Sequence, residues 1–80
     1  MERIMWLKLC RLSKLKQEHI NFLNILALQD HRLSATIIND HEINIIEYND
    51  LCQEIFNLSK HINPILLNQM VITSHQLFNN

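Results

Sequence analysis

Residues 9–26, LCRLSKLKQEHINFLNIL, carry apolar side chains at the spacing of an α-helix. Leu12, Leu15, Phe22 and Leu26 follow one another at intervals of three, seven and four residues. These positions fall on one side of a helix with 3.6 residues per turn, and most polar side chains of the stretch fall on the other. The pattern continues in both directions and predicts a helix over residues 3–28.

Two more helices are predicted downstream. Apolar side chains recur every three or four residues from about 32 to 61, and either Asp30 or Ser34 can cap the first turn. This helix should end before Asn63-Pro64, because the residue before a proline avoids helical backbone. Proline suits the first turn of a helix, so a last helix is predicted over residues 64–77.

The number of helices depends on Asn49-Asp50. The apolar rhythm continues across this pair and favours one long central helix, whereas a break there would give four helices instead of three. In both cases the sequence predicts a single all-α domain over residues 1–80, folded as a small antiparallel bundle.

Composition limits the class of protein. The chain has 80 residues, no glycine and 48% hydrophobic residues. Without glycine, a phosphate-binding loop or a tight β-hairpin is not expected. A domain of this size buries only about 60% of its unfolded surface and is marginal alone. Two architectures are therefore expected: a compact bundle of three or four helices, or a smaller bundle completed by another protein or by a second copy in a homo-oligomer.

No pattern typical of an enzyme or a cofactor site is present. The five histidines form no pair with another histidine or a glutamate at one-turn spacing, so no metal, cofactor or catalytic residue is predicted. Cys10 and Cys52 lie in apolar stripes and form no Cys-x-x-Cys pair, which favours inert, reduced thiols in a cytoplasmic protein. No run approaches the roughly 18–20 apolar residues of a membrane span.

Charge is distributed unevenly. Residues 1–16 hold five basic side chains and one acidic one, whereas residues 17–80 hold two basic and seven acidic ones. A basic helix can contact phosphates, which makes a small transcriptional or nucleoid-associated regulator the alternative function. Such a protein would bind nucleic acid, or a DNA-binding protein, and its anion-binding candidates are Arg3, Lys8, Arg11 and Lys14.

The predicted last helix is apolar on more than one face. In a three-helix bundle part of this surface should remain exposed, and exposed apolar patches often mark protein interfaces. The sequence therefore favours a non-enzymatic adaptor or chaperone that holds a helical segment of a partner in an apolar groove. The predicted partner-binding residues are Leu66, Met70, Val71 and Phe78.

From Leu26 onward the order of features resembles the FliT/FlgN type of flagellar export chaperone. The similar stretches are LALQDHRLSATIINDHEINIIEYNDL and INPILLNQMVITSHQLF, and the likeness rests on apolar spacing over residues 12–78. The resemblance implies a helical hairpin followed by a shorter helix. It also implies a role in holding the aggregation-prone helical segment of a type III export substrate, through a surface that includes the four residues above.

Overall fold

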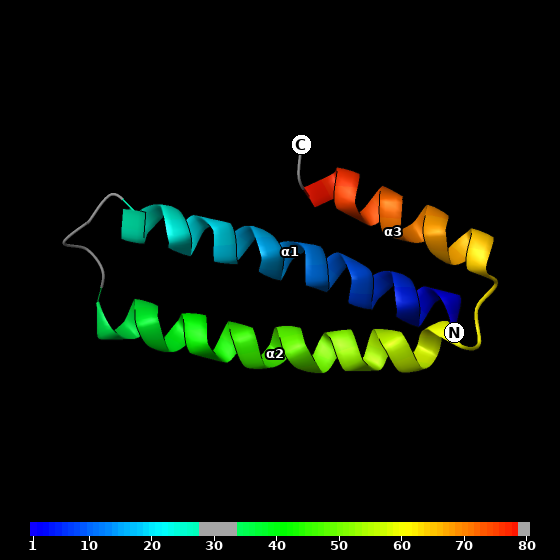
Figure 1. Cartoon of the computed structure of the whole chain (residues 1–80), viewed down its shortest axis with the longest axis horizontal. Coiled ribbons are helices and arrows are strands. Elements are labelled where there is room, and N and C mark those ends of the chain that lie inside the picture. Colours follow the sequence, from blue (N-terminus) through cyan, green and yellow to red (C-terminus); the bar gives the residue numbers. More distant parts are fainter. Residues whose placement is uncertain (28–33, 79–80) are drawn as a thin grey trace.

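The computed structural model describes residues 1–27 and 34–78, and these ranges form three α-helices and no strand (Figure 1). Helix α1 spans Glu2–Ala27, α2 spans Ala35–Ser59 and α3 spans Pro64–Phe78. The prediction of an all-α bundle is confirmed, and each helix begins or ends within a few residues of its predicted bounds.

Local side-chain caps explain where the second and third helices begin. The hydroxyl of Ser34 accepts a hydrogen bond from the backbone N–H of Ile37 at 3.3 Å. The other predicted cap, Asp30, lies outside the described residues. At α3, the Asn63 side-chain oxygen accepts from the N–H groups of Ile65 at 2.9 Å and Leu66 at 3.3 Å. These bonds satisfy donors that the first turn of a helix leaves without partners.

Helix α2 continues through Asn49 without interruption and ends two residues earlier than predicted. It ends because the N–H of His61 bonds to the carbonyl of Leu58 and that of Ile62 to Ser59, which tightens the chain into a turn. In the described ranges α1 and α2 have nearly equal lengths, 26 and 25 residues.

The helix in the middle of the bundle is α1. It packs against both other helices, whereas α2 and α3 share few direct contacts, so α1 lies between them (Figure 1). The Cα atoms extend over 47 × 24 × 15 Å. Three helices side by side at the usual spacing of about 8–10 Å need a width of roughly 21–25 Å, which matches the middle dimension. The bundle is thus an open layer, in which α1 and not the second helix is central.

The buried core lies at one end of this layer, where α1 begins, α2 ends and α3 begins. Met5, Leu9 and Ile62 form its centre. Partly buried side chains from the two outer helices pack around it: Ile55, Leu58, Leu67 and Met70. The core therefore joins all three helices at a single point and leaves the opposite end of the α1–α2 pair with little buried apolar surface.

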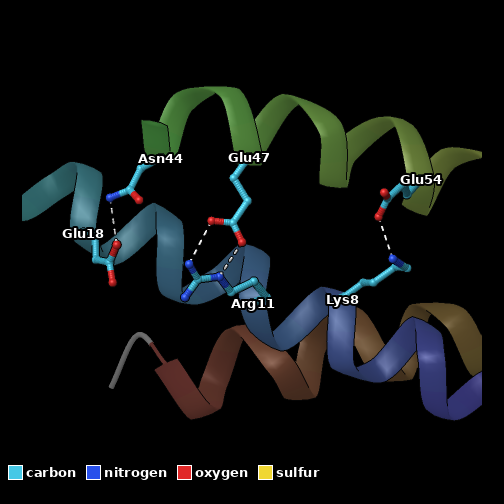
Figure 2. Close-up of polar contacts among 6 residues, drawn as sticks. All are labelled: Lys8, Arg11, Glu18, Asn44, Glu47 and Glu54. Atoms are coloured by element: carbon cyan, nitrogen blue, oxygen red, sulfur yellow. Dashed lines mark hydrogen bonds and ion pairs between the residues drawn. The ribbon is translucent and has the colours of Figure 1, made fainter. Parts of the chain in front are cut away.

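Polar side chains set the register of α1 against α2 (Figure 2). Lys8 forms an ion pair with Glu54, and Arg11 forms one with Glu47. Farther along α1, the side-chain N–H of Asn44 donates to the Glu18 carboxylate at 2.9 Å. Residue numbers rise on α1 as they fall on α2, so the two helices are antiparallel. We call these three contacts the polar seam.

Candidate functional site

An apolar groove runs between α1 and α2. Its volume is about 410 Å³, and apolar side chains from both helices make up much of its wall. Its lining residues are Leu15, Lys16, His19, Ile20, His41, Asn44, Ile45 and Tyr48. Arg11 and Glu18 of the polar seam lie about 140–160° around α1 from Lys16, because each residue turns the helix by about 100°. The Lys16 side of this groove therefore faces away from Arg11 and Glu18, whereas Asn44 belongs both to the polar seam and to the groove wall.

A second groove, of about 340 Å³, runs between α1 and α3. Its lining residues are Leu9, Leu12, Ser13, Lys16, Val71, Ile72, Ser74, His75 and Gln76. Lys16 lines both grooves, so the two grooves lie beside each other on one surface of the layer. We call the residues that line the two grooves the groove face.

The groove face continues along α2 as an exposed apolar stripe. Ile45 lines the first groove, and Ile38 and Phe56 lie seven residues before it and eleven after it. These spacings keep the three side chains within about 20° on the helix surface. All three are exposed, as is Cys52, which lies seven residues after Ile45. The apolar surface on this side therefore extends beyond the groove itself.

A stack of three rings lies where α1 meets α2. The His41 ring packs against Phe22 with ring centroids 3.8 Å apart and against His19 with centroids 5.2 Å apart. Both histidines also line the first groove. Their rings add aromatic surface to its wall, and their ring nitrogens add polar atoms. Within residues 1–27 and 34–78, no group of three or more His, Cys, Asp or Glu side chains is arranged to hold a metal ion.

Tyr48 supplies another polar atom on the wall of the first groove. Burial raises the pKa of its phenol above the ordinary value, and the neighbouring Cys52 raises it further. The phenol is therefore neutral at physiological pH, and its hydrogen bond with the Cys52 side chain contributes to the raised pKa.

The four predicted partner-binding residues of α3 have different environments. Val71 is exposed and lines the second groove. Met70 is half-buried and packs against the core, and Leu66 is also half-buried. Phe78 ends α3, and its side chain lies outside the described part of the structure. The first groove was missed at the level of sequence, although the spacing of Ile38, Ile45 and Phe56 could have indicated it.

The four predicted anion-binding residues also divide into two pairs. Lys8 and Arg11 form ion pairs with Glu54 and Glu47, and the hydrogen bonds that Arg11 donates to the Glu47 carboxylate raise the pKa of Arg11. Arg3 and Lys14 are exposed and make no ion pair with another described residue. Half of the predicted basic surface is therefore used to hold α2 against α1.

No match connects this chain with a known family. Comparison with protein-family models, with curated proteins and with solved structures gives no match. The resemblance to flagellar export chaperones thus still rests on apolar spacing alone.

The two thiols differ in environment. Both cysteines are free; Cys10 is half-buried, and burial raises its pKa. Cys52 is exposed on the groove-face side of α2, although it lies in a predicted apolar stripe. Its apolar stripe faces outward because α1 covers a different side of α2.

In the described ranges, no helix combines the length and hydropathy that crossing a membrane would require.

Proposed function

We propose that this protein is a non-enzymatic adaptor or chaperone that holds a helical segment of another protein against its groove face. The observation that carries this proposal is the pair of adjacent apolar grooves meeting at Lys16. An amphipathic helix binds such a surface through apolar side chains repeated at i, i+3 or i+4 and i+7.

The small core supports the same function. Among the described residues only five apolar side chains are buried, whereas fifteen large ones are exposed. These exposed side chains leave apolar surface that a bound partner would cover.

Delivery of an export substrate to a type III or flagellar secretion apparatus is the finer form of this proposal. It is supported by the similarity of apolar spacing to the FliT/FlgN type of chaperone. In that role the protein would act in the cytoplasm. It would cover an aggregation-prone helix until export begins.

The test compares two neighbouring isoleucines of α2. Ile45 lines the first groove and is 42% exposed, whereas Ile46 is 63% exposed and lines neither groove. Tagged wild type, Ile45→Asp and Ile46→Asp are purified from the native cell, and co-purified proteins are quantified. We expect Ile45→Asp to lose its partner by at least about tenfold, since a buried charge at an interface costs several kcal/mol. Ile46→Asp should retain it.

Circular dichroism of both variants checks that they fold. Equal recovery of every partner by folded wild type, Ile45→Asp and Ile46→Asp would contradict the proposal. The pair Val71→Asp and Ile65→Asp repeats the comparison on α3, because Val71 lines the second groove and the exposed Ile65 does not.

Direct binding to nucleic acid is the second candidate, and it has narrower support. Arg3 and Lys14 are exposed on α1, but Lys8 and Arg11 already pair with carboxylates of α2. A protein that neutralises several phosphates loses affinity steeply as salt is added. Binding to duplex DNA that weakens with salt and is lost in Arg3→Gln/Lys14→Gln would favour this function over the first.

A further inference from the structure

Lys16 occupies the point where the two grooves meet, and its charge is not compensated there. Among the described residues that line the grooves, no side chain is acidic. Lys16 itself makes no ion pair within the described part of the chain, in contrast to Lys8 and Arg11 on the same helix. The nearest carboxylate in sequence, Glu18, accepts a hydrogen bond from Asn44 and lies about 160° around α1 from Lys16.

A second cation lies beside the apolar stripe of α2. The Lys60 ammonium is 4.9 Å from the ring centroid of Phe56, which is a cation–π distance. This charge therefore lies against the exposed apolar surface instead of pairing with a carboxylate of α2. Both lysines place positive charge on this surface, and one exposed carboxylate, that of Glu42, lies beside the stripe at about 60° around α2 from Ile45.

We propose that the groove face binds an acidic amphipathic helix of another protein, whose carboxylate pairs with the Lys16 ammonium while apolar side chains on either side of it enter the two grooves. This inference rests on the proposed function and specifies the chemistry of the partner. Complementary charge at an apolar interface selects the partner and speeds encounter more than it adds affinity.

A second copy of the chain fits this surface less well. In a two-fold dimer the same patch is present on both subunits, so the groove face would meet itself. The groove lining of the second copy contains no acidic side chain among the described residues, so it would supply no carboxylate to Lys16. A flat anionic membrane is also a poorer fit. The two grooves beside α1 are concave, so the side chains of a helix can enter them, whereas a planar surface leaves them unfilled.

The experiment uses the full chain and three designed helical peptides with one common apolar stripe. One position in the middle of this stripe, with apolar side chains on either side of it, is Glu in the first peptide, Gln in the second and Lys in the third. Fluorescence anisotropy at low salt should give the order Glu, then Gln, then Lys, from tightest to weakest. The advantage of the Glu peptide should shrink as salt is added, because salt screens exposed charges.

Two lysines of α1 provide the matched comparison. Lys16 lines both grooves, and Lys14 is exposed about 160° around the helix from it. We expect Lys16→Gln to weaken binding of the Glu peptide by roughly two- to fivefold, and Lys16→Glu by roughly tenfold. Lys16→Glu should also bind the Lys peptide more tightly than wild type does. Lys14→Glu should leave the order of the three peptides unchanged.

The outcomes separate this inference from the proposed function. Equal affinity for the three peptides, or no binding of any of them, would contradict the inference that the partner is acidic. The comparison of Ile45→Asp with Ile46→Asp in cells tests the proposed function independently. Sedimentation of wild type as a dimer that Ile45→Asp converts to a monomer would assign the face to a second copy. Binding to vesicles of anionic phospholipid that is lost in Lys16→Glu, without peptide binding, would assign it to a membrane.

Discussion

The Arg11 guanidinium on α1 makes two hydrogen bonds to the Glu47 carboxylate on α2, from Nε to Oε1 at 2.7 Å and from Nη2 to Oε2 at 2.8 Å (Figure 2). Two parallel bonds between planar groups fix their relative orientation, which a single lysine contact does not. The pair therefore does more to set the register of the two helices than to add stability, because exposed ion pairs contribute little to stability.

Removing the charge of Glu47 should give a pH-dependent loss of stability. The hydrogen bond from Arg11 lowers the pKa of Glu47 below its ordinary value. The stabilisation is therefore present above the unfolded pKa of about 4.3 and is lost as pH falls through the lower, folded pKa. We expect Glu47→Gln to melt below wild type at pH 7, and the two melting temperatures to converge under acid conditions.

Glu42→Gln is the control for this prediction. Glu42 is exposed on α2 and makes no ion pair with another described residue. Glu42→Gln should therefore leave the change in melting temperature between pH 7 and acid conditions the same as in wild type. A Glu47→Gln melting curve that matches wild type at every pH would mean that the pair is absent in solution.

Truncating Met5 should test the single core that joins the three helices. Met5 is 0% exposed and lies in the centre of that core. Met5→Ala should cost about 2–5 kcal/mol, a large part of the roughly 4–12 kcal/mol expected for 80 residues. Met5→Leu keeps most of the volume and should cost less than about 1.5 kcal/mol.

Leu7→Ala serves as the comparison, since Leu7 is 57% exposed on the same helix. It should change the free energy of unfolding by no more than about 0.5 kcal/mol. Urea denaturation measures all three variants. Equal costs for Met5→Ala and Leu7→Ala would contradict the described core.

Removing the Asn63 cap should loosen α3. The Asn63 side chain accepts hydrogen bonds from two backbone N–H groups of the first turn. Asn63→Ala should therefore cost about 1 kcal/mol, and Asn63→Asp should keep the cap. Asn68→Ala, at an exposed position inside α3, should be neutral or slightly stabilising because alanine favours helix. Thermal melts that rank Asn68→Ala below Asn63→Ala would rule out the cap.

The two cysteines should react at different rates. Cys52 is exposed, whereas Cys10 is half-buried and its pKa is raised by burial. Because the thiolate is the reactive form, iodoacetamide at neutral pH should modify Cys52 first. Mass spectrometry of Cys10→Ser and Cys52→Ser measures each thiol separately. Bound Glu peptide should slow the reaction of Cys52 and leave Cys10 unaffected, and faster modification of Cys10 would refute this arrangement.

Local signals account for what was predicted correctly. The three- and four-residue spacing around Leu12 and Leu15 predicted α1, and Asn63-Pro64 marked the start of α3. A helix and its cap depend on hydrogen bonds that reach only two to four residues along the chain, so a short stretch of sequence contains all the information needed. For the same reason Ser34 could be predicted as one of two candidate caps, the other being Asp30.

The candidate site could be predicted only in part. Val71 was predicted and lines a groove, but Met70 packs against the core and the first groove was not anticipated. Lys8 and Arg11 were assigned to an anion, yet their partners are Glu54 and Glu47, 46 and 36 residues away. Nothing in the sequence near a lysine indicates a partner so distant.

The sequence by itself determined an all-helical fold, the approximate ends of its helices and an excess of apolar surface, and it left open whether Asn49-Asp50 divides the second helix. Only the tertiary structure decided that α1 lies between the other two helices, that the layer is open, and that Lys16 and Ile45 share one face. The physical reason is that these helices carry apolar side chains on more than one side. Which side packs inward depends on the rotation of each helix against its neighbours, and that rotation is fixed by contacts between residues far apart in the chain.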